Sequence, residues 1–347
     1  MGVYVSEKDV PSDELLRFYW IYKNFTITVT IIMVFFTIFV MVTSTTRNIS
    51  KYRWYIVHSL LWSLFSDIMG YLVGPVLLFP FSCYFSVNSI IQTDLQKIVF
   101  LIVGVTAMLG KNISVMFQFE HLYVKSQSVV SVYQKWFGDV PVRIEVLARG
   151  AMLVVVFVGI EVPLIFALPN QPQQLKIYSN QDRVISYLAQ KYPSMTCVSS
   201  TPNISKPMMP TFLLMNMIAI IFSAMLFHMH LSIRRNSLNV QTYRLQMMLF
   251  WSLAAQMAAM YLLIILPFIF GIAWILLGVA RSPTLAVICF CFFFLHTSVN
   301  CLLVLYFIKP YRDFIKGHIP AFRRESGITR SVTPMASIMA RPYPSKV

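Results

Sequence analysis

The sequence is poor in charged residues, and poorest in acidic ones. Only 12% of its 347 residues are charged, and 13 aspartates and glutamates stand against 28 lysines and arginines. Soluble globular domains carry roughly 25% charged residues, so this composition excludes an ordinary soluble domain and indicates a polytopic membrane protein. The basic residues lie in short connectors between apolar runs and form no soluble basic face. We therefore expect membrane lipids as partners and no nucleic acid.

Motifs for metal binding and catalysis are missing. The five cysteines show no CxxC or Cys/His ligand spacing, and no HExxH or nucleophile and base motif occurs. We therefore expect no enzymatic activity, no metal site and no cofactor. The last apolar run contains no lysine, which excludes a retinal Schiff base.

Seven apolar runs are present, and a membrane helix needs about 20 predominantly apolar residues. The runs cover residues 25–42, 56–79, 95–119, 147–168, 211–231, 245–271 and 284–308. Pro267 is expected to kink the sixth helix, because proline removes a backbone donor. The predicted fold class is an all-α membrane protein, a seven-transmembrane helix bundle.

Lysines and arginines predict the orientation. The connectors after the odd-numbered runs, together with the tail, hold about twice as many of them as the opposite side, and such an excess marks the cytoplasm. Residues 1–24 are therefore expected to form an extracellular N-terminus, and residues 323–347 a disordered basic cytoplasmic tail. The predicted location is the plasma membrane.

The segment after the seventh run is predicted to be an amphipathic surface helix over residues 309–322. Pro310 ends the membrane helix, and Tyr311, Phe314 and Ile315 then recur at helical spacing, with Arg312 on the opposite face. Such a helix lies on the membrane surface rather than crossing it.

The proposed outer side carries candidates for covalent modification. Cys83 and Cys197 lie there in an oxidising setting, and we predict a disulfide between them, the alternative being two separate thiols. Asn24 and Asn203 begin glycosylation sequons, of which Asn24 is the poorer because it abuts the first helix. Residues 169–210 are too long for an ordinary connector, so they are expected to form a lid over a ligand cavity or a glycosylated spacer.

Polar residues inside the membrane runs predict a buried polar core. A charge at the bilayer centre is costly unless it is paired or hydrated. Asp67 and Lys111 fall at equal depth on consecutive helices, which favours an ion pair over separate contacts with water in a polar cavity. Asn112 and Asn300 are expected to join this core.

A second polar set lies at middle or outer depth and predicts the ligand site. Polar groups that converge under a lid are typical of a small-molecule cavity, although each one is also explained by packing between helices. The set is Glu161, Asn216, Gln256, Tyr261 and His296.

The inner face is expected to bind a signalling partner. Glu120 and His121 end the third helix, where Glu120 is expected to pair with a neighbouring helix in the resting state and to release it on activation; the alternative is snorkelling at the membrane surface. The other expected contacts are Arg234, Arg235, Tyr311 and Arg312.

Four stretches carry a resemblance to a known family. YRWYIVHSLLWSLFSD opens the second run, NISVMFQFEH closes the third, QMMLFWSLAAQMAAMYLLIILP lies in the sixth, and KPYR follows the seventh. With these stretches the chain resembles the nematode serpentine chemoreceptors of classes H and I. The Asp-Arg-Tyr and Asn-Pro-x-x-Tyr motifs of rhodopsin-like receptors are absent, and Glu120 and His121 stand where the first would be.

The resemblance implies a G-protein-coupled receptor on the cilia of chemosensory neurons. It would bind an environmental odorant or pheromone and activate a heterotrimeric G protein. The alternatives are a seven-helix ligand-gated channel or a transporter. A channel of the insect odorant receptor type would place its N-terminus in the cytoplasm, and a transporter would show internal repeats, which we do not find.

Overall fold

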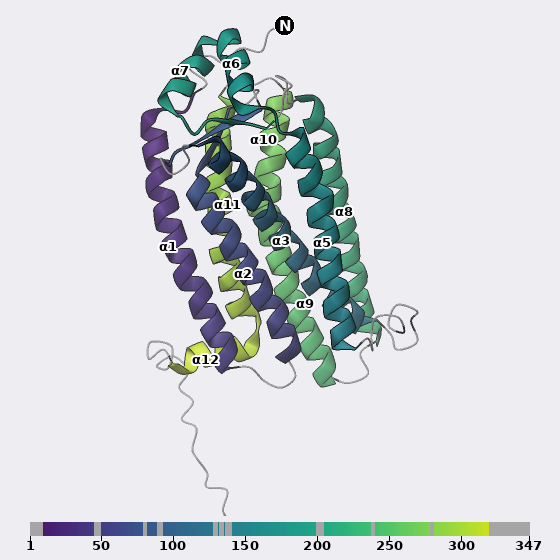
Figure 1. Ribbon diagram of the computed structural model, residues 1–347. Coiled ribbons are helices and arrows are strands. Elements are labelled where there is room, and N and C mark those ends of the chain that lie inside the picture. Colours follow the sequence, from purple (N-terminus) through teal and green to yellow (C-terminus); the bar gives the residue numbers. More distant parts are fainter. Residues whose placement is uncertain are drawn as a thin grey trace, which may run out of the picture.

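The protein forms a bundle of long helices (Figure 1). The computed structural model describes residues 10–44, 50–78, 82–88, 93–127, 131, 135, 141–198, 205–236, 240–277 and 281–318. Within them, seven helices are long and apolar enough to cross a membrane, which confirms the predicted fold class. Their bounds are α1 Asp13–Thr43, α2 Ser50–Val73, α3 Asp94–Ser126, α5 Val142–Ala167, α8 Ser205–Asn236, α9 Val240–Met260 continued by η3 Tyr261–Ile265 and α10 Leu266–Leu276, and α11 Ser282–Phe307.

The helices are longer than the apolar runs from which they were predicted. α1 begins at Asp13, so residues 13–24 belong to a helix and not to an N-terminal tail, and α3 continues to Ser126. The cause is that an apolar run stops at the first polar residues, whereas a helix continues until its backbone is capped. Ser12 caps α1 by accepting a hydrogen bond from the Leu15 amide at 3.2 Å, and Thr93 forms a capping box with Gln96 at the start of α3.

The sixth span departs from regular helix geometry just before Pro267. Residues Tyr261–Ile265 form a π-helical turn between α9 and α10. Proline cannot donate a hydrogen bond to the carbonyl of Leu263, and its ring would clash with that carbonyl in a regular helix. The wider π turn relieves both conflicts, so the disturbance predicted at Pro267 takes this form.

One end of the bundle carries a folded cap. Two helices, α6 Gln171–Gln181 and α7 Arg183–Lys191, sit above the ends of α1 and α11 (Figure 1). Beneath them, the strands β1 Pro75–Leu77, β2 Cys83–Ser86 and β3 Thr196–Cys197 form an antiparallel sheet. The segment expected as a lid or spacer loop is therefore mostly helical over its described part.

The cap has its own hydrophobic core, which joins it to the bundle. Leu16 and Tyr19 of α1, Ile185 and Leu188 of α7, and Phe294 of α11 are all buried in it. Such packing fixes the cap in place, because burying each of these side chains contributes about 1.5 to 3 kcal/mol.

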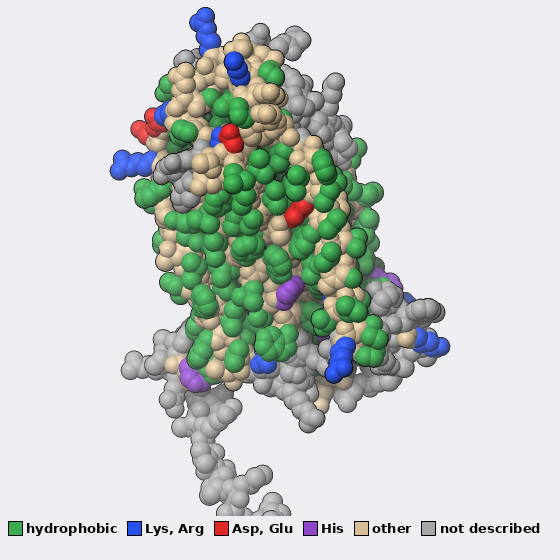
Figure 2. Space-filling view, in the orientation of Figure 1, with side chains coloured by type: hydrophobic (Ala, Val, Ile, Leu, Met, Phe, Trp, Pro, Cys, Tyr) green, Lys and Arg blue, Asp and Glu red, His purple; other side chains and the backbone are tan. Residues whose placement is uncertain are grey.

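The opposite end carries α12 Lys309–His318, whose Tyr311 is fully buried in a second core. Residues 319–322 of the predicted surface helix, and the predicted tail 323–347, lie outside the described residues. Figure 2 shows hydrophobic side chains over the sides of the bundle, with lysines and arginines toward its ends. The two ends are called the cap end and the α12 end below.

Candidate functional site

The predicted disulfide between Cys83 and Cys197 is confirmed. It joins β2 to β3, where the two cysteines face each other in the strand register. Gln171 of α6 reinforces this link, because its amide accepts a hydrogen bond from the Cys197 N–H at 2.8 Å and donates one to the Cys197 carbonyl at 2.9 Å. The disulfide therefore ties both cap helices to the hairpin that follows α2.

A buried lysine holds that hairpin against α1. Lys23 has no exposed surface, and its ammonium donates to the Asn88 amide oxygen and, at 3.4 Å, to the Tyr71 carbonyl. Gly74 begins the hairpin with a φ of +48°, and a Cβ there would lie 2.6 Å from the lysine nitrogen. Only glycine fits at this position.

The placement of Asn24 argues against its glycosylation. Its side chain lies within α1, donates to the Trp20 carbonyl at 2.6 Å and accepts from the Tyr71 hydroxyl at 2.9 Å. Glycosylation acceptors lie in surface loops, and an asparagine engaged inside a helix is not one of them. The other predicted acceptor, Asn203, lies outside the described residues.

The predicted ion pair between Asp67 and Lys111 is confirmed in the middle of the bundle. The lysine nitrogen lies 3.8 Å from a carboxylate oxygen, and the two side chains are 3% and 1% exposed. Lys111 also lies over the ring of Phe293, 4.8 Å from its centroid. The pair links α2, α3 and α11, and each charge offsets the cost of burying the other.

Several buried polar atoms around this pair have no hydrogen-bond partner among the described residues. They include His296 Nδ1 and Asn300 Oδ1 of α11, and the Ser63 and Ser66 hydroxyls of α2. Buried polar groups without protein partners are normally satisfied by internal water.

Asn112 was predicted to join this core, and that prediction is wrong. It is exposed, whereas its neighbour Lys111 is buried. Adjacent residues on a helix point about 100° apart, so both cannot face the bundle centre equally well. Asn300, in contrast, is 3% exposed.

The predicted ligand residues are spread over four helices. Glu161 of α5 is half-buried and accepts a hydrogen bond from Thr106 of α3, and Asn216 of α8 is half-buried. His296 is 2% exposed beside the polar core, whereas Tyr261 is 37% exposed on the bundle surface. Glu161 is therefore placed between two helices, and Tyr261 points outward.

Gln256 belongs to a network directed toward the α12 end. It is 5% exposed, accepts from the Gln118 amide at 3.4 Å and donates to Ser252 at 3.2 Å. Gln118 also donates to the Tyr52 hydroxyl at 2.7 Å, and Tyr52 is in the first turn of α2. The network therefore joins α2, α3 and α9.

Glu120 pairs with Arg149 of α5, a residue that sequence reasoning missed. Their charged atoms are 3.2 Å apart, and Arg149 also donates to the Tyr55 hydroxyl of α2. His121 stacks on the ring of Tyr55 at 4.6 Å. Glu120 and Arg149 each lie about 10 Å from the α12-end terminus of their helices, so the depth argument used for Asp67 would have found this pair.

The other predicted coupling residues differ in accessibility. Arg234 and Arg235 are exposed at the end of α8, and Arg312 of α12 is half-buried. Tyr311 has no exposed surface and packs into the core of the α12 end. As it stands, Tyr311 cannot touch a partner, so its role in this structure is to anchor α12.

Comparison with known families gives one result that covers most of the chain. A family profile described as serpentine type 7TM GPCR chemoreceptor Srh matches residues 16–321. None of the curated proteins matches this chain significantly. The matched range includes all seven membrane helices apart from the first residues of α1.

Proposed function

The chain belongs to the Srh family of serpentine seven-transmembrane chemoreceptors, and from this premise we propose that it binds an environmental small molecule and activates a heterotrimeric G protein. The observation that carries the proposal is the family match over residues 16–321 on a chain with seven membrane helices. We place the receptor in the plasma membrane of chemosensory neurons, at their cilia.

The proposed orientation puts the cap outside the cell and α12 in the cytoplasm. The excess of basic residues in the connectors and tail at the α12 end supports it, since positive loops stay inside. The disulfide in the cap supports it too, because disulfides persist in oxidising compartments. Glycosylation at Asn203 would follow from the same orientation.

The proposed ligand site lies among the helices on the cap side of the polar core. Its candidate contacts are Glu161, Asn216 and His296, which are half-buried or buried. Glu161 is the strongest of them, because its recorded hydrogen bond is to the neutral Thr106 and no cation among the described residues lies within ion-pair distance of it. Such a carboxylate is costly in a membrane unless something compensates it, and a polar ligand group would do so.

The proposed G-protein contact is the basic surface at the α12 end. Arg234 and Arg235 are exposed there, and Glu120 and His121 lie in the last two turns of α3. In this proposal the pair of Glu120 and Arg149 holds the resting arrangement, and activation breaks it.

The experiment is expression of the full chain, with an N-terminal epitope, in cells with a G-protein readout against an odorant panel. We expect the epitope to be stained in intact cells and at least one compound to give a G-protein response that Glu161→Gln weakens. The double variant Arg234→Ala with Arg235→Ala should lose the response while its surface level stays normal. An epitope reached only after permeabilisation, or currents that persist without G proteins, would refute the proposal.

A further inference from the structure

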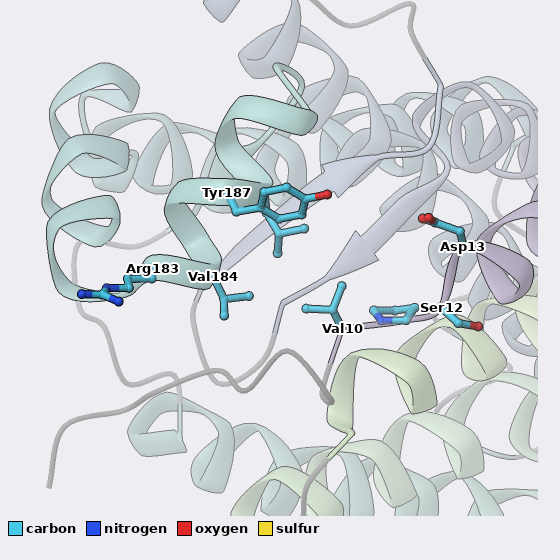
Figure 3. Close-up of a pocket in the computed structure, with 8 residues that line it drawn as sticks. Val10, Ser12, Asp13, Arg183, Val184 and Tyr187 are labelled. Atoms are coloured by element: carbon cyan, nitrogen blue, oxygen red, sulfur yellow. The ribbon is translucent and has the colours of Figure 1, made fainter.

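The cap contains a pocket that is separate from the proposed helical site. It lies between the first residues of α1 and helix α7, has a volume of about 480 Å³, and falls within the range of small-molecule sites. Its lining residues are Val10, Pro11, Ser12, Asp13, Arg183, Val184, Tyr187 and Leu188. Figure 3 shows α7 on one side of this space and the start of α1 on the other.

The pocket stands clear of the membrane. α1 has 31 residues and is therefore about 46 Å long at 1.5 Å per residue, whereas the hydrocarbon layer is about 30 Å thick. Because α1 runs through to the α12 end, its first turns project beyond the cap-side surface of the bilayer. A molecule dissolved in the surrounding water reaches this pocket without entering the helical bundle.

Of the charged groups next to the pocket, Asp13 is paired with Lys191, and the guanidinium of Arg183 points away from the pocket. Lys191 donates a hydrogen bond to the Asp13 carboxylate at 3.0 Å, and this contact raises the pKa of Lys191, so the lysine ammonium offsets the charge of the carboxylate. In Figure 3 the guanidinium of Arg183 extends away from the space between Val10 and Val184. The pocket therefore does not select for an ion of either sign.

Apart from these charged groups, the lining residues are apolar except for two hydroxyls, those of Ser12 and Tyr187. The Ser12 oxygen is engaged as the cap of α1, where it accepts a hydrogen bond from the Leu15 amide. Val10 and Val184 face each other across the pocket, and the hydroxyl of Tyr187 lies above them on the side of Asp13 (Figure 3). That hydroxyl has no hydrogen-bond partner among the described residues, and the Tyr187 side chain is 60% exposed. Apolar side chains beside one hydroxyl that is not used in the fold suit an apolar chain that carries one hydrogen-bonding group.

We propose that this cap pocket binds small uncharged molecules that have an apolar chain and one carbonyl or hydroxyl oxygen, which Tyr187 holds by a hydrogen bond. The site is additional to the proposed helical site and does not depend on G-protein coupling. It gives the receptor a place on its water-facing cap at which such compounds are held.

The test uses a cysteine in the pocket as a reporter. We place the full-length receptor with Val184→Cys in lipid nanodiscs and treat it with a water-soluble cationic methanethiosulfonate. The rate at which the cysteine is labelled is then measured at increasing concentrations of 2-decanone. Native thiols give a low background, because Cys289, Cys291 and Cys301 lie inside α11 and the two cap cysteines form a disulfide. Lys176→Cys is the matched control, since Lys176 is exposed on α6 outside the pocket.

We expect 2-decanone to slow labelling of Val184→Cys and to leave Lys176→Cys unchanged, with decanoate of equal chain length at least tenfold less potent. Adding Tyr187→Phe should lower the potency of 2-decanone about fivefold, the effect of losing one neutral hydrogen bond. Adding Glu161→Gln should leave the protection of Val184→Cys by 2-decanone unchanged, although it is expected to weaken the G-protein response. This difference separates the cap pocket from the helical site. The proposal would be overturned if 2-decanone failed to slow labelling of Val184→Cys, or if it slowed labelling of both cysteines equally. It would also be overturned if decanoate protected Val184→Cys more strongly than 2-decanone and Arg183→Gln removed that protection.

Discussion

Glu120 on α3 and Arg149 on α5 meet at 3.2 Å, and the arginine also reaches Tyr55 on α2. The guanidinium lies over the rings of Tyr55 and Phe117 at 4.8 and 5.2 Å. One arginine thus connects three helices at the α12 end. Both charged side chains are partly exposed, at 34% and 18%, so the contact can open without burying an unpaired charge.

Arg149→Ala is expected to raise basal G-protein signalling roughly fivefold, because the resting contact between α3 and α5 is lost. The measurement is ligand-free signalling divided by surface receptor. Arg143→Ala is the control, since Arg143 is exposed on the same helix. The swap Glu120→Arg with Arg149→Glu should return the basal level toward normal, and a swap as active as Arg149→Ala would contradict the role of the pair.

Asp67→Ala is expected to lower surface expression strongly. Leaving Lys111 buried without its partner costs about 3 to 5 kcal/mol, enough to unfold a marginal protein. Lys111→Ala in the same background removes the orphaned charge and should restore part of the surface signal in flow cytometry. If the double variant expresses no better than Asp67→Ala alone, the pair does not stabilise the fold.

Loss of the disulfide is expected to destabilise the receptor by about 2 to 5 kcal/mol. Cys83→Ser, Cys197→Ser and the double variant should lose thermal stability to the same extent, because each breaks the same bond between β2 and β3. Cys291→Ser is the matched control, since Cys291 is a free thiol. Unequal losses in the two single variants would mean that a thiol acts by itself.

Gly74→Ala is expected to destabilise the hairpin by about 1 to 2 kcal/mol, because alanine is strained at this positive φ and its Cβ would meet the Lys23 ammonium. Gly317→Ala in α12, where an added Cβ meets nothing within 4 Å, should be neutral or slightly stabilising. Thermal unfolding of the detergent-solubilised receptor measures both. Equal melting temperatures for the two variants would contradict this account of Gly74.

The sequence predicts the membrane helices, but it does not predict the residues at which the helices begin and end. The seven apolar runs locate the membrane helices because the bilayer admits only segments that satisfy their own backbone hydrogen bonds. The same runs miss the start of α1 at Asp13, since Ser12 and a polar first turn decide where that helix begins. They also miss α6 and α7, which are too short to be seen without the core on which they pack.

Some of the site residues can also be predicted from the sequence, and others cannot. Asp67 and Lys111 are predictable as a pair, because the bilayer makes an unpaired charge costly and depth along a helix can be read from residue numbers. Gln256 stays a predicted ligand contact, and its depth along the helix alone does not show that Gln118 and Tyr52 lie near it. Tyr311 is predicted as a contact for a partner and is instead buried, since sequence periodicity does not show which core a helix meets.

The sequence by itself determines the membrane class and the number of spans, because the bilayer admits only long apolar segments. It also predicts the disulfide and the central ion pair, and the structure confirms both against the alternatives of free thiols and separate hydrated charges. Only the tertiary structure decides which faces meet. It brings Arg149 to Glu120, packs α7 on the first turns of α1 and leaves a pocket between them. The physical reason is that burial depends on rotation about each helix axis, and that rotation is set by packing against neighbouring elements.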